Sequence, residues 1–426
     1  MPEKLLITEL KKRQKELLEF IGDRVVIIVS AYEKVRNNDV HHAFRQDSTF
    51  NYFTAFPEPG SVAVFDAKDD SECYQLYVRE RDKFMELWNG FRFGTEGAKE
   101  YFNPDAAYTV SQLEDILLKK LAGRKTVLLC EQHHPLEDRL LALTDGLKST
   151  GDEEEIIQKI SSMRLIKSGF EVDCMREASR ISIDAHHKLM ENVSGVEHEH
   201  NLHADFIHHC TNEGAMLMAY PPIVASGANA TCLHYGANNQ PIDRSGLVLV
   251  DAGCEIGGYA ADITRTFPAS GKFTQVQKMC YDLVLKAQQD VLEKVMPGES
   301  LSSLHAVAVN TLTEGLISMG VIKCSVDEAV EKRTYTEYYP HGTGHWLGLD
   351  VHDTGPGKEA KFSPGVVFTV EPGLYFQTYN DSVLEEFKGV GIRIEDNILV
   401  TEDGYENLTS SCVKKAEDIE AKVLSS

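Results

Sequence analysis

Apolar runs and amphipathic stretches alternate along the first third of the chain. The runs at 25–29, 62–65 and 126–129 have the length and composition of buried strands. Residues 113–121 carry apolar side chains at helical spacing and predict a helix. Strands that alternate with helices are typical of layered α/β domains. We therefore expect residues 1–163 to form an α/β domain with a mixed sheet.

A polar, acidic stretch at 148–157 separates this region from the rest of the chain. Allowing for one connecting helix, a new helix is predicted after this stretch, because Ser168 and Glu171 have the spacing of a capping box. Apolar residues from Val172 to Leu189 then recur at helical spacing. These signals place a second domain at 164–426.

Two buried strands of the second domain end in a carboxylate. They cover 247–251 and 366–371, and each is followed by a small or rigid residue and then glycine. A second predicted strand with its own carboxylate follows each of them, at 259–266 and 391–396. A buried strand-end acid is costly unless it is paired or bound to a metal. One such acid would indicate a capped turn, whereas the doubled pattern favours a common centre built from Asp251, Asp262, Glu371 and Glu395.

Strand alternation refines this interpretation, because every second side chain lies on the same face. Asp262, Thr264 and Thr266 are predicted to share one face of their strand. Arg393 and Glu395 are predicted to share one face of theirs. Arg393 would then orient carboxylates or meet a substrate, and a plain ion pair is the competing interpretation.

Histidines are concentrated in the glycine-rich segment 340–353, where His341, His345 and His352 fall within twelve residues. Glycine permits close backbone approach, so this combination favours a functional site. The segment 198–203 also contains histidines and resembles the zinc-binding motif H-E-x-x-H, but position 202 is leucine. We interpret that second cluster as the exposed, polar start of a helix.

Composition excludes several classes of protein. The 426 residues are 42% hydrophobic and 26% charged, as in an ordinary globular protein, and the formal net charge of −23 disfavours nucleic acid as a partner. Nine scattered cysteines without a C-x-x-C pair favour reduced thiols and a cytoplasmic location. No apolar run reaches the ~18 residues of a membrane span, and we expect neither a secretory signal nor membrane binding.

The chain resembles the family that contains aminopeptidase P, prolidase, methionine aminopeptidase and creatinase. The first domain resembles the N-terminal domain of aminopeptidase P and of some prolidases, which methionine aminopeptidases lack, at 44–50 and 53–60. In the second domain the resemblance rests on Leu233-His-Tyr235, Asp251-Ala-Gly-Cys-Glu255, Gly258 to Phe267, His341 to Asp353, Glu371-Pro-Gly373 and Gly391-Ile-Arg-Ile-Glu395-Asp396.

The resemblance implies an α+β "pita-bread" catalytic domain that encloses two divalent metal ions. It implies that Asp262 and Glu395 bridge the ions. Four carboxylates and one imidazole are a hard, oxygen-rich set that suits Mn²⁺, with Co²⁺ or Zn²⁺ as alternatives. The implied ligands are Asp251, Asp262, His345, Glu371 and Glu395. The implied residues around the substrate are His234, His341 and His352, with Arg393 behind the ligands.

The implied activity is hydrolysis of the bond between an N-terminal residue and a following proline, through a metal-bridging hydroxide. Glu371 would take up and pass on the proton. The substrates would be proline-containing peptides, and the enzyme would be a homodimer or homotetramer like its relatives. The family also suggests that Trp88 reaches an active site, and a packed aromatic is the competing interpretation.

Two alternatives to an aminopeptidase P-type enzyme stay open. A prolidase, which cuts only Xaa-Pro dipeptides, would share the ligands and the N-terminal domain. The motifs at 251–255 and 262–267, the context of His345 and the short stretch between Asp353 and Gly365 favour the aminopeptidase. A non-catalytic peptide-binding relative would have lost a ligand, and none is missing.

Overall fold

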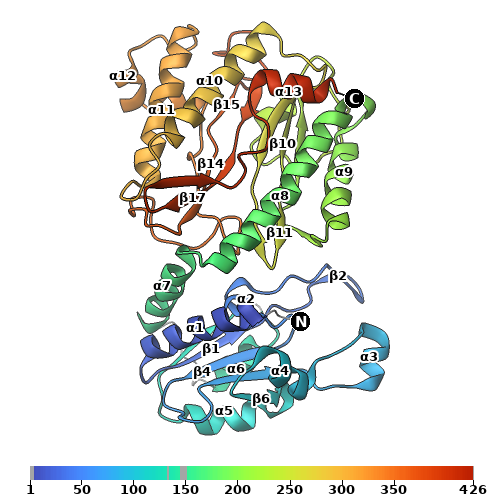
Figure 1. The fold of residues 1–426 in the computed structure, drawn as a ribbon, viewed down its shortest axis with the longest axis vertical. Helices are drawn as coiled ribbons and strands as arrows, with labels where there is room; N and C mark the ends of the chain where they lie inside the picture. The colour runs from blue at the N-terminus through green and yellow to red at the C-terminus, as the bar shows by residue number, and fades with distance from the viewer. Residues whose placement is uncertain (1–3, 132–133, 144–150, 426) are drawn as a thin grey trace. The chain divides into compact units, whose positions relative to one another are not determined.

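The computed structural model describes residues 4–131, 134–143 and 151–425. The chain divides into two compact units, Met1–Met163 and Arg164–Ser426 (Figure 1). Residues 148–150 of the polar stretch lie outside the described residues, and helix α7 (Gly151–Leu165) crosses the division. Within the described part of the chain, no helix combines the length and apolar character needed to cross a membrane.

The first unit is built on a five-stranded mixed sheet with the order β6-β5-β4-β1-β7. Strand β1 pairs antiparallel with β4 and parallel with β7, while β5 pairs antiparallel with β4 and parallel with β6. The predicted strands and the α/β class with a mixed sheet are confirmed. The strands are β1 (Val25–Val29), β4 (Val62–Asp66), β5 (Tyr74–Val78), β6 (Ala106–Thr109) and β7 (Thr126–Leu129).

Helix α5 (Leu113–Leu121) confirms the helix predicted in this unit and buries Leu113, Leu117 and Leu121 at four-residue spacing. The other elements are α1 (Lys4–Ile21), β2 (Val35–Asn37), β3 (Val40–His41), α2 (Ser48–Thr54), α3 (Lys83–Asn89), α4 (Gly94–Phe102) and α6 (Glu137–Leu143). Trp88 of α3 is 71% exposed, so the interpretation as a packed aromatic was wrong.

Two antiparallel three-stranded sheets form the frame of the second unit. One has the order β13-β10-β9 and the other β14-β17-β18, and a strand with a carboxylate at its end lies in each. A further three-stranded sheet has the order β12-β11-β8, and β15 pairs with β16. The strands of this unit are β8 (Leu217–Met218), β9 (Ile223–Ser226), β10 (Leu247–Asp251), β11 (Cys254–Ile256), β12 (Tyr259–Ala260), β13 (Thr264–Pro268), β14 (Val367–Val370), β15 (Gly373–Tyr375), β16 (Gly391–Arg393), β17 (Asp396–Thr401) and β18 (Gly404–Asn407).

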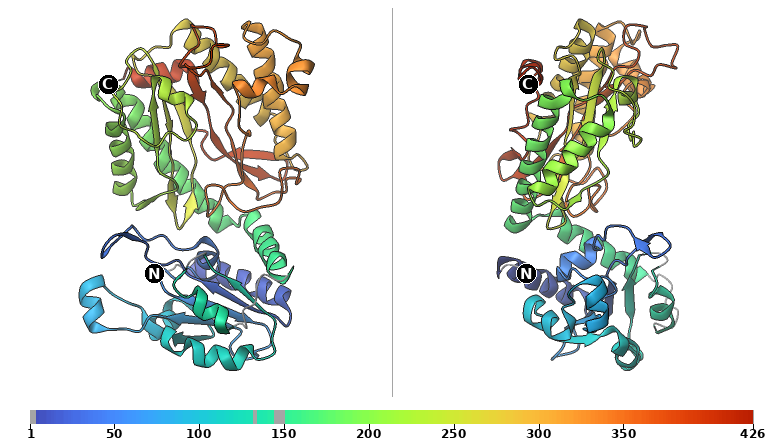
Figure 2. Two further views of the ribbon diagram at one scale, coloured as in Figure 1. Left: turned by 180° about the vertical axis from the view of Figure 1, so that it is seen from behind. Right: turned by 90° about the vertical axis from the view of Figure 1, so that its right-hand side faces the viewer.

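Helices cover these strands in two groups (Figure 1, Figure 2). Helices α8 and α9 pack on each other, α8 lies against β11 and β12, and α9 lies against β9. Helices α10 and α11 also pack on each other, and α10 lies against β14, β15 and β16. The helices are α8 (Gly169–Asn192), α9 (Glu199–Asn212), α10 (Gln275–Leu292), α11 (Leu301–Ser318), α12 (Val326–Glu331) and α13 (Ala416–Val423).

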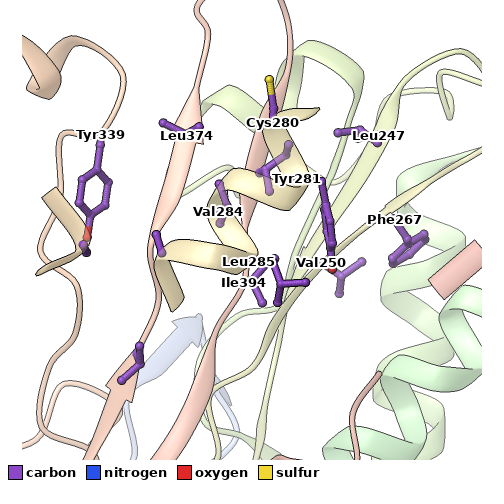
Figure 3. Packing of buried hydrophobic residues seen from close by; sticks show 14 of the residues in the cluster. Leu247, Val250, Phe267, Cys280, Tyr281, Val284, Leu285, Tyr339, Leu374 and Ile394 are labelled. Carbon is purple, nitrogen blue, oxygen red and sulfur yellow. The ribbon is translucent and has the colours of Figure 1, made fainter. Parts of the chain in front are cut away.

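Local sequence explains where these helices begin. Both bonds of the predicted capping box between Ser168 and Glu171 are present at the start of α8. Helix α10 carries apolar residues on the face that enters the core, where Tyr281 and Val284 are fully buried (Figure 3). This packing holds the two sheets in place and thereby positions the ends of β10 and β14.

Candidate metal centre

Two strand ends bring the first carboxylates together. Asp251 is the last residue of β10 and lies opposite Thr264 of β13. Glu371 follows directly after β14, whose last residue is paired with the first residue of β17. The turn after Asp251 needs glycine, because a β-carbon at Gly253 would lie 1.9 Å from the carbonyl oxygen of Ala261.

Asp262 and Glu395 do not lie inside strands, so the predictions of continuous strands at 259–266 and 391–396 were wrong. Strand β12 ends before Asp262, and β16 ends before Glu395. The strand pairing ends at Asp262 and Glu395, where the backbone N–H groups instead bond to residues that lie far away along the chain. The Glu395 N–H donates to the carbonyl of Thr264 (3.1 Å), and the Asp262 N–H donates to the side-chain oxygen of Asn397 (3.0 Å).

One cavity of about 250 Å³ gathers all of the implied ligands and the implied residues around the substrate, whereas Trp88 does not line it. Three carboxylates and Arg393 are buried, while His234 and His352 are exposed. The cavity also includes Leu233, Gly342, Gly344 and Lys358. The candidate residues along its wall are His234, Asp251, Asp262, His341, His345, His352, Glu371, Arg393 and Glu395.

The closest cluster of donor atoms comprises Asp262, His345 and Glu395. One ligand atom of each lies within 4.8 Å of the others, a spacing that a single ion can span. The His345 Nε2 lies 3.3 Å from Asp262 Oδ2 and 3.6 Å from Glu371 Oε1. Thr264 supports the cluster, since its hydroxyl donates to Glu395 Oε2 over 2.7 Å. Asp262 and Glu395 therefore lie at the middle of the donor set.

Tyr220 completes the carboxylate cluster and was missed by the sequence analysis. Its hydroxyl lies 2.7 Å from Asp251 Oδ1 and 2.5 Å from Asp262 Oδ1. One hydroxyl carries one proton, so it can donate to only one of the two carboxylates at a time. Tyr220 stands in a loop before two prolines, and no periodic pattern of the sequence marks it.

Arg393 and Tyr375 link the carboxylates to His341. The guanidinium donates to Asp251 Oδ2 over 2.6 Å and to the Tyr375 hydroxyl over 3.0 Å. His341 Nε2 lies 2.8 Å from that hydroxyl, and its Nδ1 lies 2.8 Å from the carbonyl of Gly342. Burial and the charge of Arg393 lower the pKa of His341 to about 3. A neutral His341 that donates from Nδ1 and accepts at Nε2 satisfies all of these contacts.

The electrostatics of the cavity favour added positive charge. Burial raises the pKa of Glu371 to about 7. Burial and the neighbouring carboxylates raise the pKa of Glu395 well above its usual range. Burial opposes the charge on His345, but its hydrogen bond to Asp262 and the charge of Glu371 prevail and raise its pKa to about 9. The clustered carboxylates hold protons because they are buried and because their negative charges repel one another. A divalent cation can replace those protons and neutralise the same charge.

The histidine-rich segment 198–203 is only partly exposed, which corrects the surface prediction for Glu199 and Leu202. His200 is exposed and His198 is half-buried, whereas Glu199 is fully buried. The surface interpretation was therefore wrong for Glu199, whose carboxylate accepts hydrogen bonds from segment 226–240.

Both units match known protein families. Residues 173–402 match the model of metallopeptidase family M24, and residues 10–129 match that of the aminopeptidase P N-terminal domain. The chain is 38% identical over 416 residues to an Xaa-Pro aminopeptidase of Haemophilus influenzae, covering 96% of this chain and 95% of the relative. It is 35% identical over 408 residues to Xaa-Pro aminopeptidase 3 of Homo sapiens, covering 93% of this chain and 80% of the relative.

Solved structures give the same result. Zinc-substituted aminopeptidase P of Escherichia coli in complex with product superimposes with a TM-score of 0.92 at 37% identity, covering 98% of both chains. Aminopeptidase PepP of Pseudomonas aeruginosa superimposes with a TM-score of 0.91 at 36% identity, covering 100% of this chain and 98% of that one. The resemblance stated from the sequence motifs and the two-domain fold class are thereby confirmed. The chain belongs to metallopeptidase family M24.

Proposed function

We propose that the chain is an Xaa-Pro aminopeptidase, a metal-dependent enzyme that releases the N-terminal residue of a peptide whose second residue is proline. The observation that carries this proposal is the complete set of five candidate ligands around one cavity. Relatives named Xaa-Pro aminopeptidase match this chain over nearly its whole length, including the N-terminal domain.

Two divalent ions would be held by Asp251, Asp262, His345, Glu371 and Glu395. The fit rests on the donor chemistry and on the single Tyr220 proton between two carboxylates. Mn²⁺ is the proposed metal, because it suits four carboxylates and one imidazole, while the Escherichia coli relative has been solved with zinc. When bound, such ions polarise the scissile carbonyl and activate water.

The side chains of this chain supply the remaining chemistry. Glu371 has a pKa of about 7 before metal binding and would take the proton of the attacking water and pass it to the proline nitrogen. His234 and His352 are exposed to the cavity and would donate to the developing oxyanion. Neutral His341 would hold the substrate, and Arg393 would hold Asp251 in place.

The assay compares Gly-Pro-Leu with Gly-Pro after the protein has been stripped and reloaded with Mn²⁺. Release of glycine from the tripeptide, with little from the dipeptide, is the expected result. Cleavage of the dipeptide alone would show a prolidase. Failure to cut either peptide with Mn²⁺, Co²⁺ or Zn²⁺ would show a binding protein on a peptidase fold.

Three further properties belong to this proposal. We propose a domain boundary between 163 and 164, which the division of the chain into compact units supports. A cytoplasmic location is supported by all nine cysteines, each within the described residues, being free thiols. A homodimer or homotetramer is supported by the exposed apolar side chains of Phe84, Leu87, Trp88 and Phe91. Light scattering after size-exclusion chromatography measures the oligomer.

A further inference from the structure

Glu199 is a fully buried carboxylate at the first residue of α9. Its Oε1 accepts from the Ser226 N–H (2.9 Å) and from the Asn229 side-chain amide (2.8 Å). Its Oε2 accepts from the Tyr235 hydroxyl (2.8 Å) and from the Gln240 N–H (2.9 Å). Hydrogen bonds to an ionised acceptor are the strong ones, and all four donors face the same carboxylate.

These four donors belong to one stretch of chain, 226–240, which leaves the end of β9 and begins with the turn Gly227–Thr231. Ser226 and Gln240 are the two ends of this loop, and both donate to Glu199, so Glu199 holds the two ends together. The backbone adds one more closure, because the Glu199 N–H donates to the Gln240 carbonyl over 3.0 Å. Loop ends held at one point restrict every residue between them.

His234 lies inside this loop and lines the cavity, next to Tyr235. Tyr235 is half-buried, whereas His234 is exposed, so packing holds the tyrosine more than the histidine. The other residues that anchor the loop lie further from His234 along the chain. Asn238 bonds to Val224 and Pro222, and Thr231 bonds to Gln377. Of the anchors, the Tyr235–Glu199 bond is adjacent to His234 in the chain.

We propose that Glu199 is a positioning residue for His234, which it holds toward the substrate through Tyr235 and the closed loop 226–240. This inference rests on the proposed function, in which His234 stabilises the oxyanion. A carboxylate is required because four donors converge on it. A glutamine would keep one acceptor oxygen and turn an amide toward donors.

Glu199→Gln and Tyr235→Phe test the proposal through kcat and KM for Gly-Pro-Leu. Both should lower kcat by roughly ten- to a hundredfold, as expected for a misplaced catalytic group, with KM changed less. Metal content should stay at the wild-type level, because none of the four partners is a proposed ligand. Asp66→Asn is the matched control: Asp66 is buried in β4, accepts from Arg124 and Lys68, and does not line the cavity.

His234→Ala provides the double-mutant cycle that separates positioning from general damage. In that background, Glu199→Gln and Tyr235→Phe should each change kcat less than twofold. The proposal is overturned if either variant keeps wild-type kcat when His234 is present. It is also overturned if the losses are as large without His234.

Hydrogen exchange on the metal-free protein gives a readout that does not depend on catalysis. Glu199→Gln should speed amide exchange about tenfold or more in 227–240 and leave α10 and β14 unchanged, since local anchors set local opening. Faster exchange throughout the second unit would overturn the proposal. If the wild-type enzyme cut no Xaa-Pro peptide, the proposed function would fail, while the exchange experiment would still decide whether Glu199 anchors the loop.

Discussion

Arg393 donates from Nη2 to Asp251 Oδ2 over 2.6 Å and so joins the end of β16 to the end of β10. The Arg393 side chain is 4% exposed, and its Nε and Nη1 donate to Thr264 and Tyr375. Three bonds to three different residues hold the planar guanidinium in one orientation, and one of them holds the Oδ2 oxygen of Asp251.

Arg393→Lys should therefore reduce activity although the charge is kept. A lysine can replace one of the three bonds and leaves Tyr375 without its donor, so we expect kcat to fall by roughly a hundredfold. Steady-state kinetics with Gly-Pro-Leu measures the loss. Arg176→Lys, on an exposed ion pair with Glu406, is the control and should keep full activity. Wild-type kcat for Arg393→Lys would contradict the orienting role.

Glu371→Gln should abolish turnover while much of the metal is retained. The amide keeps one ligand oxygen but cannot take the proton of the attacking water, so kcat should fall by at least roughly a thousandfold. Kinetics and elemental analysis of the same preparation separate the two effects. Glu386→Gln, on the surface, is the control. A fully active Glu371→Gln enzyme would exclude the assignment.

Metal affinity should rise with pH. In the metal-free protein the pKa of His345 is raised to about 9 and that of Glu371 to about 7, so both hold a proton below pH 7, and Glu395, whose pKa is raised well above its usual range by burial and the neighbouring carboxylates, adds to the protons that metal must displace. Bound metal displaces these protons, and each proton released changes affinity about tenfold per pH unit. The dissociation constant of Mn²⁺ should therefore increase steadily from pH 9 to pH 7, and more steeply below pH 7.

Calorimetric titration with Mn²⁺ at several pH values measures how the dissociation constant changes with pH. Glu371→Gln carries no titrating carboxyl, so the extra steepness below pH 7 should disappear in that variant. An Mn²⁺ affinity that does not change between pH 6 and pH 9 would contradict the conclusion that metal binding displaces protons from these residues.

Tyr220→Phe should destabilise the metal-free protein more than the metal-loaded one. The hydroxyl separates Asp251 from Asp262, and its loss leaves buried acceptors without a donor at a cost of about 1–3 kcal/mol. Bound cations would offset the same repulsion. Urea unfolding with and without Mn²⁺ measures both values. Tyr379→Phe, at an 80% exposed tyrosine, is the control. Equal losses in both states would show that Tyr220 serves packing alone.

Sequence reasoning succeeded where short-range patterns determine position. The apolar runs ending at Asp251 and Glu371 mark buried strands whatever surrounds them, and the glycine-rich context marks His341 and His345. Each of these residues lies at the cavity. The two-domain class was also predictable from local patterns. Strands and helices alternate in the first unit, and a capping box marks the first helix of the second.

Sequence reasoning failed where contacts between residues far apart in the chain determine the structure. Asp262 and Glu395 stand in segments with ordinary strand composition, and their N–H groups bond to Asn397 and Thr264, which lie more than a hundred residues away along the chain. Tyr220 is recognisable only once two carboxylates are known to meet beside it. Glu199 was interpreted as exposed because its neighbours are polar, and its four donors come from residues 226–240.

The cross-bonds between Asp262 and Asn397 and between Glu395 and Thr264 also determine when the centre can form. Asp251 and Asp262 leave the ribosome well before His345, Glu371 and Glu395, so a nascent chain holds two of the five proposed ligands until residue 345 emerges and the full set only after residue 395. Asp262 bonds to the Asn397 side chain and Glu395 bonds to the Thr264 carbonyl, so each carboxylate residue needs a partner from the distant segment to be held in place. Metal loading should thus follow synthesis of nearly the whole second domain and should not guide its early folding.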